Sequence, residues 1–120
     1  PGLLEHCAPD TEGGREAAQK LLARRPKAQA ILAFNDLVAV GVIQSCIETG
    51  RQVPEDVAVI GVDDIPLATI VRPALTTLHV DLAEIGRLAM GTILEILGRS
   101  GTESHASLCI EPRLIIRESA

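Results

Sequence analysis

Blocks of apolar and polar residues follow one another along the chain and predict strands and helices in turn. Two apolar runs of strand length, 28–34 and 57–62, predict strands buried on both faces, as in a parallel sheet. Weaker patterns predict further strands at 3–6, at 76–80 and at 108–117, the last interrupted by a proline. Helices are predicted for 16–25, 36–49, 67–72 and from 82 to about 97, with a polar loop at 98–107. The alternation predicts an α/β fold with a mainly parallel sheet and flanking helices.

Capping residues mark where these helices begin and end. Thr11 is a predicted N-cap for the first helix, and Asn35 with Asp36 suits the start of the second. Gly50 suits the end of that second helix, because glycine readily adopts the left-handed conformation there. The second helix is apolar most of the way round, so we expect it to pack on more than the sheet.

Polar residues follow three of the predicted strands, at His6-Cys7, at Asn35-Asp36 and at Asp63-Asp64. Because the carboxyl ends of parallel strands share one edge of a sheet, we expect all three groups along that edge, where ligands bind in such folds. Asp63 is the better ligand candidate, since Asp64 equally fits a turn-stabilising residue. Asp36 is either a first-turn acid favoured by the helix dipole or a ligand.

Composition and charge narrow the class of protein. The 120 residues carry a net charge of −5, and a nucleic-acid-binding face normally needs the opposite sign, so direct contact with DNA or RNA is not expected. Phe34 is the only aromatic residue, which predicts an aliphatic core. Three distant cysteines, Cys7, Cys46 and Cys109, predict small buried thiols in a cytoplasmic protein rather than disulfides. No apolar stretch has the length of a membrane span, and the start at Pro1 without Met is typical of a fragment.

Enzymatic chemistry finds little support in the residue pattern. Asp36, Asp63 and Asp64 together could hold magnesium for phosphoryl transfer, but no lysine follows Lys27 to hold the phosphoryl group. Glycine-rich nucleotide loops are absent. His79 and the other histidines lack an acid at useful spacing, so no base–nucleophile pair is evident. We therefore expect no catalytic residue, no metal and no cofactor.

Several motifs in the same order resemble the lactose/purine (LacI/GalR) repressor family. The chain carries the family's A-x-N-D-x-x-A-x-G segment at 33–41 and its G-x-x-V-P-x-D-V loop at 50–57. Residues 59–64 are similar to V-x-G-x-D-D, residues 73–77 to P-x-L-T-T, and Gly86 to the glycine that opens the next helix. Order and spacing agree over nearly the whole chain, which is more specific than any single motif.

The resemblance implies a periplasmic-binding-protein-like fold of type I, in which two subdomains enclose a ligand. The chain would be part of an effector-binding domain, with 1–75 and 108–120 in the second, C-terminal subdomain. Residues 76–107 would form a crossover strand and helix that pack on a first subdomain, which this chain lacks together with the DNA-binding helix-turn-helix. The implied effector contacts are Asn35, Asp63 and the turn at Cys7 and Ala8. The implied dimer surface is formed by Leu37, Val38, Val42, Ile43, Cys46, Leu67 and Ile70.

The function implied by the resemblance is that of a sensor. A small effector, of the sugar or nucleobase class, would control operator binding by a homodimer or higher homo-oligomer, with DNA held by the helix-turn-helix outside this chain and no membrane involved. Two alternatives remain open from the sequence: a sugar-binding protein of a transport system with the same fold, and a phosphoryl-transfer enzyme using the three acids.

Overall fold

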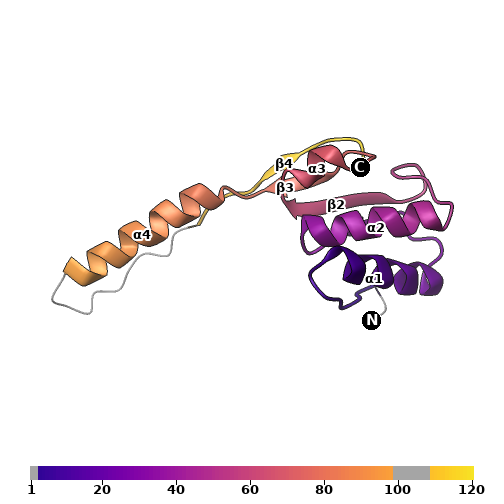
Figure 1. Ribbon diagram of the computed structural model, residues 1–120, viewed down its shortest axis with the longest axis horizontal. Coiled ribbons are helices and arrows are strands. Elements are labelled where there is room, and N and C mark those ends of the chain that lie inside the picture. The colour runs from indigo at the N-terminus through magenta and orange to yellow at the C-terminus, as the bar shows by residue number, and fades with distance from the viewer. Residues whose placement is uncertain (1–2, 99–108) are drawn as a thin grey trace. The chain divides into compact units, whose positions relative to one another are not determined.

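The computed structural model describes residues 3–98 and 109–120, which fall into two compact units (Figure 1). The first unit comprises Pro1–His79 and Arg113–Ala120, and the second comprises Val80–Pro112. Residues 76–79, expected with the crossover, belong by their strand pairing to the first unit. Within the described ranges, every helix is too short or too polar to cross a membrane.

The first unit is a four-stranded sheet with helices, in the order β1-β2-β3-β4. β1 pairs with β2 and β2 with β3 in parallel, whereas β4 runs antiparallel to β3. This arrangement confirms the predicted α/β fold with a mainly parallel sheet. The elements of this unit are α1 (Thr11–Arg24), β1 (Ala30–Leu32), α2 (Asp36–Glu48), β2 (Ala58–Asp63), α3 (Leu67–Ile70), β3 (Thr76–His79) and β4 (Arg113–Ile115).

The core of the first unit lies around α2. This helix packs against α1, against β2 and against α3, and Figure 1 shows α1 and α2 side by side. The prediction that the second helix packs on more than the sheet is confirmed, because Val38, Ala39, Val42, Ile43 and Cys46 are all buried. The core is aliphatic, as expected, since Phe34 is exposed.

α1 begins earlier than the sequence predicts, and two glycines explain the difference. Asp10, not Thr11, is the N-cap, and its Oδ1 accepts a hydrogen bond from the Gly13 N–H at 2.8 Å. Gly13 and Gly14, which indicate a turn by composition, lie inside the helix. A Cβ at Gly14 would stand 2.2 Å from the carbonyl oxygen of Val38 in α2, so glycine is required where the two helices touch.

One predicted strand is absent, and another is present but not buried on both faces as predicted. Residues 3–6 form no strand; the side chains of Leu3 and Leu4 are exposed, and no neighbouring strand among the described residues pairs with them. β1 is the edge of the sheet rather than a strand buried on both faces, since Leu32 is 77% exposed and only Ile31 points into the core. The physical reason is common to both cases: burial on both faces needs neighbours that the described residues do not supply.

The second unit contains α4 (Leu82–Gly98), which begins where the sequence predicts. The side chain of Asp81 accepts from the Glu84 N–H at 2.9 Å, as expected for a helix start. No residue of α4 is buried, so its apolar stripe is exposed. Ile110 and Cys109 follow without strand structure, and the predicted loop and strand residues 99–108 lie outside the described residues.

The cysteines only partly follow the expectation of buried thiols. All three are free, but only Cys46 is buried, whereas Cys7 and Cys109 are exposed. Burial raises the pKa of the Cys46 thiol, and the positive charge of Arg51 offsets part of that effect.

Candidate functional site

Asn35 and Asp63 lie at the same edge of the sheet. β1 and β2 are parallel and pair Ala30 with Ala58 and Leu32 with Ile60, so their carboxyl ends lie at one edge of the sheet. Asn35 comes three residues after the end of β1, and Asp63 is the last residue of β2. Both residues therefore lie at the carboxyl ends of adjacent parallel strands. This is the placement that the sequence predicted, and it is the edge at which ligands bind in α/β sheets.

Asn35 combines a capping role with a spare donor. Its Oδ1 accepts a hydrogen bond from the Val38 N–H at 2.8 Å, so Asn35 is the N-cap of α2. Its Nδ2 donates to the carbonyl oxygen of Pro9 at 3.4 Å. An amide nitrogen carries two hydrogens, so one donor of this half-buried side chain remains for a ligand.

Asp63 supplies acceptors at the same edge. Its carboxylate makes no hydrogen bond or ion pair within residues 3–98 and 109–120, although the residue is only half-exposed. Partial burial raises the pKa of the Asp63 carboxyl, and the negative charge of Asp36 raises it further. A carboxylate with open lone pairs and an amide donor at the same sheet edge suit a ligand rich in hydroxyl or N–H groups.

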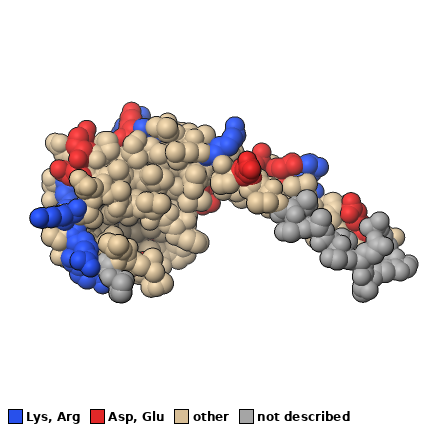
Figure 2. Space-filling view, turned by 180° about the vertical axis from the view of Figure 1, so that it is seen from behind, with Lys and Arg blue, Asp and Glu red and all other residues tan. Residues whose placement is uncertain are grey.

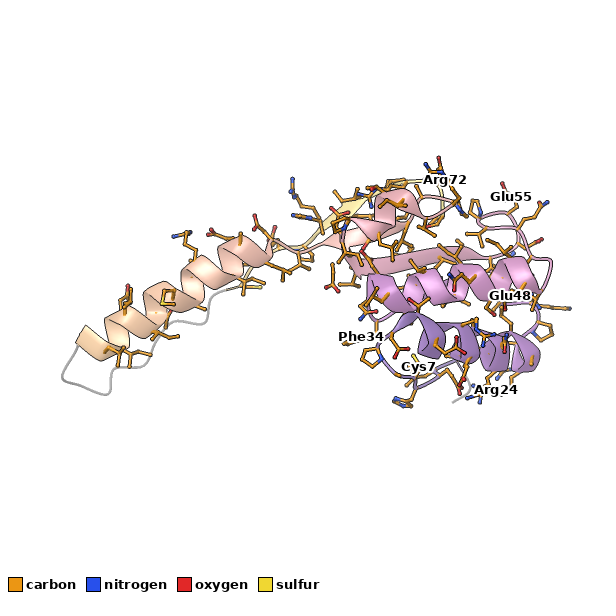
Figure 3. All side chains as sticks on the ribbon, in the orientation of Figure 1. Cys7, Arg24, Phe34, Glu48, Glu55 and Arg72 are labelled. Atoms are coloured by element: carbon orange, nitrogen blue, oxygen red, sulfur yellow. The ribbon has the colours of Figure 1, made fainter. Side chains whose placement is uncertain are left out.

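Cys7 and Ala8, the other predicted contacts, lie in the segment before α1. They are exposed, and the hydrogen bond from Asn35 to Pro9 ties the end of this segment to the sheet edge. Figure 3 shows Cys7 and Phe34 at one end of α2, away from Glu48 at the other end. Cys7 and Phe34 also line a groove of about 580 Å³ along β1. The wall of this groove is mostly apolar and includes neither Asn35 nor Asp63. Figure 2 shows that much of the visible surface of this unit carries no charged side chain.

Asp36 is a structural residue. The sequence left open whether it is a first-turn acid of the helix or a ligand. The residue is 0% exposed. Its Oδ1 accepts from the Thr77 hydroxyl at 2.5 Å and its Oδ2 from the Ile65 N–H at 2.9 Å. It thus ties α2 to β3 and to the turn after β2, and a ligand role is excluded by the burial. Gly61 makes room for it, since a Cβ at Gly61 would stand 2.2 Å from Asp36 Oδ1.

Asp64 is held by two basic side chains that the sequence did not connect to it. Its Oδ1 lies 2.6 Å from Arg117 Nη2 and its Oδ2 lies 3.0 Å from His79 Nδ1. Desolvation opposes ionisation of Asp64, but the hydrogen bonds and charges of Arg117 and His79 outweigh it and lower the pKa of the carboxyl. His79 therefore does have an acid partner, contrary to the sequence-based expectation.

A specific signal could have found His79. It ends the strand next to β2, so the rule that placed Asn35 and Asp63 at one edge also applies to His79, which pairs in register with Asp63. Arg117 offered no such signal, because it is distant in sequence and comes to Asp64 only through the antiparallel return of the chain.

The three acids do not form an open metal site. No group of three or more potential metal ligands occurs among the described residues. Asp36 is buried and Asp64 is paired, which leaves only the Asp63 carboxylate open. The phosphoryl-transfer alternative therefore lacks the arrangement of carboxylates that it requires.

The predicted dimer residues divide into two groups. Val38, Val42, Ile43 and Cys46 are between 0% and 5% exposed inside this unit, so their observed role is core packing. The sequence pattern did not separate them from surface residues because α2 is apolar nearly all round. The remaining predicted residues retain accessible surface: Leu37, Leu67 and Ile70.

The fold is an α/β domain with polar side chains at the carboxyl ends of its parallel strands, and comparison with known proteins identifies its family. The family model of the periplasmic binding protein-like domain matches residues 3–120. The chain belongs to this family, and its relatives are regulators of the LacI family, which confirms the resemblance seen in the motifs.

Three relatives illustrate the similarity. The ribose operon repressor of Escherichia coli (strain K12) is 40% identical over 108 residues, which are 90% of this chain and 32% of that repressor. A LacI family regulator from Arthrobacter sp. FB24, solved in complex with lactose, is 41% identical with a TM-score of 0.80, over 94% of this chain and 43% of that one. The transcriptional regulator CelR in complex with cellobiose is 30% identical with a TM-score of 0.93, over 99% of this chain and 36% of that one. The chain spans about a third of the length of the curated relatives it matches.

Proposed function

We propose that this chain is the effector-sensing part of a cytoplasmic transcription regulator of the LacI family. The observation that carries the proposal is the placement of Asn35 and Asp63 at the carboxyl ends of two adjacent parallel strands. Asn35 offers a free amide hydrogen, and Asp63 offers a carboxylate that is unpaired within the described residues. The names of the relatives, which include a ribose operon repressor and lactose and cellobiose complexes, support a regulator of this kind.

The proposed ligand is a small neutral molecule of the sugar or nucleobase class. Sugar hydroxyls or a purine N–H can donate to Asp63, while Asn35 can donate to a ring or carbonyl oxygen. Cys7 and Ala8 would close one side of the site, since their segment is tied to Asn35 through Pro9. No bond in the ligand needs to break, because the edge holds no base–nucleophile pair in the described residues.

Control of transcription would follow from linkage. Residues 1–79 and 113–120 would form one subdomain of the effector-binding domain, since β3 and β4 pair in its sheet, and the chain between them would pass to the other. A ligand that binds one arrangement of the two subdomains better than another shifts the equilibrium between them. That shift would reposition a DNA-binding helix-turn-helix outside this chain, which agrees with the acidic charge of the chain itself.

We expect Asp63→Asn to weaken effector binding by roughly tenfold to a hundredfold, because a hydrogen bond to a charged group is worth about 1.5–3 kcal/mol. The measurement has two stages. A thermal-shift screen of pentoses, disaccharides and nucleobases on the full-length gene product first identifies a ligand. Isothermal titration of that ligand then compares the variant with the parent protein.

Glu55→Gln is the matched control for this substitution. It also replaces one carboxylate by an amide, but in the loop before β2, at the end of the strand remote from Asp63 (Figure 3). We expect its affinity to equal that of the parent. Equal affinity of Asp63→Asn and the parent would contradict a contact between Asp63 and the effector.

We also propose that the regulator is a homodimer or higher homo-oligomer and that Leu37, Leu67 and Ile70 contribute to its interface. The side chain of Ile70, at the end of α3, is 67% exposed, although it is a large apolar group. α3 contacts α2, the helix that carries Leu37. Exposed apolar side chains on adjoining helices are typical of protein–protein contacts.

Ile70→Glu is expected to raise the dimer dissociation constant of the full-length gene product by about 100-fold. The reason is that a charge buried without a partner at an interface costs roughly 2 kcal/mol or more of binding free energy. Analytical ultracentrifugation over a range of concentrations measures this constant. Gln19→Glu adds the same charge to the exposed face of α1 and serves as the control. If the dimer dissociation constant is unchanged in both variants, Ile70 does not lie in the interface.

A further inference from the structure

Two consecutive non-glycine residues have positive φ at the end of β2: Asp63, its last residue, and Asp64 directly after it. Asp63 has φ 110° and Asp64 has φ 56°, and the only other positive φ among the described residues is at Gly50. Side chains disfavour such a backbone, and it persists only where the surroundings hold it in place. The candidate ligand contact Asp63 therefore has a backbone conformation that side chains disfavour.

The side chain of Asp64 is the restraint on one side of Asp63. Its two oxygens bind Arg117 and His79, and both Asp64 and Arg117 are only 18% exposed. Arg117 is fixed in turn, because its Nη1 donates to the carbonyl oxygen of Leu75 at 2.8 Å and its backbone N–H to the Thr76 hydroxyl at 2.9 Å. Asp64 is thus held by a group that cannot easily move.

Restraints also act on the other sides of Asp63. Ile65, two residues further on, donates its N–H to the buried carboxylate of Asp36. Asp63 itself pairs in register with His79 across the β2–β3 ladder. The backbone of Asp63 is therefore fixed by its neighbours, while its own carboxylate stays free of hydrogen bonds within the described part of the chain.

We propose that Asp64, through its contacts with His79 and Arg117, is a positioning residue that holds Asp63 in its left-handed conformation and so places the Asp63 carboxylate for the effector. This inference rests on the proposed function for the identity of the ligand, but the geometry of the turn stands without it. Asp64 acts through Asp63 in this proposal, because its two oxygens are engaged with His79 and Arg117.

The same contacts connect the site to the two strands that link the units. His79 is the last residue of β3, and it pairs in register with Arg113, the first residue of β4. The chain leaves the first unit directly after His79 and returns directly before Arg113. The contact between Asp64 and His79 therefore joins the turn that carries Asp63 to the strand end at which the chain leaves the first unit.

NMR of the 120-residue chain tests the positioning without any ligand. The one-bond coupling between ¹³Cα and ¹Hα separates positive from negative φ, and we expect a positive-φ value at Asp63 in the parent. Asp64→Ala and His79→Leu are expected to lose that value at Asp63, whereas Asp64→Asn, which keeps an acceptor and tolerates the left-handed region, retains it. The control Glu12→Gln breaks an ion pair with Arg15 in α1 and leaves Asp63 unchanged. An unchanged Asp63 coupling in Asp64→Ala overturns the proposal.

A double-substitution cycle in the full-length gene product, with D-ribose as the probe, tests the functional consequence. We expect Asp64→Ala alone to weaken D-ribose binding about tenfold. In an Asp63→Asn background the same change has no further effect, because there is no carboxylate left to place. Additive losses would overturn positioning through Asp63. If D-ribose binds neither parent nor variants, the proposed ligand class fails for this sugar, and the NMR result alone decides the role of Asp64.

Discussion

Gly41→Ala is expected to destabilise the first unit by roughly 3 kcal/mol or more, because overpacking against backbone cannot be relieved by a rotamer change. A Cβ at Gly41 in α2 would stand 2.0 Å from the Thr11 carbonyl oxygen and 2.7 Å from the Arg15 nitrogen of α1. Gly14 of α1 faces Val38 of α2 in the same way, so the helices approach through two glycines. Urea unfolding followed by circular dichroism measures the loss.

Gly86→Ala is the matched control for the packing effect. Gly86 also lies inside a helix, α4, but nothing lies within 4 Å of the position that its Cβ would take. Alanine favours a helix over glycine by about 0.5–1 kcal/mol, so this variant should not lower stability. A loss below about 1 kcal/mol for Gly41→Ala would show that α1 and α2 separate easily, contrary to the close packing described above.

Asp36→Ala is expected to lower the free energy of unfolding by roughly 3–5 kcal/mol, as is typical when one partner of a buried polar network is removed. The substitution leaves the Ile65 N–H without its acceptor and removes the partner of the buried Thr77 hydroxyl. It also leaves a cavity beside Gly61. Urea unfolding again gives the magnitude.

A further variant separates the hydrogen bonds of Asp36 from its charge, and a second variant, at an exposed carboxylate, serves as a control. Asp36→Asn keeps an oxygen for Ile65 and a donor for the Thr77 hydroxyl, so it should lose much less than Asp36→Ala. Asp56→Ala removes an exposed carboxylate that accepts from the Gln52 N–H at 2.8 Å and should cost about 1 kcal/mol, the typical net contribution of one hydrogen bond. Similar losses for Asp36→Ala and Asp56→Ala would disprove the anchoring role of Asp36.

The placement of Asp36 and Asp63 shows how far a sequence pattern reaches. Both acids follow predicted strands, and the strand-end rule correctly put them near one edge. The rule does not say which acid is buried, because burial of Asp36 depends on the Thr77 hydroxyl and the Ile65 N–H, which lie 41 and 29 residues away. The sequence therefore left a ligand role open for a residue that the fold uses as an anchor.

The dimer residues illustrate the same limit on a helix. A helix that is apolar nearly all round has no pattern that separates core from interface. Packing of α2 against α1 and β2 buries four of its side chains, whereas Leu37 remains partly exposed. The buried residues are Val38, Val42, Ile43 and Cys46. Only the three-dimensional packing makes this division.

Sequence patterns suffice for the α/β class, for the order of the helices and of the strands that the sheet contains, for the capping of α2 by Asn35, for the edge shared by Asn35 and Asp63, and for the family. These features depend on periodicity, caps and strand ends, which are local, or on motifs that can be read directly. Three features are visible only in the folded chain: β1 is an edge, α1 and α2 touch through glycines, and Asp64 pairs with His79 and Arg117, 15 and 53 residues away. Such contacts form between distant segments, so no local pattern specifies them.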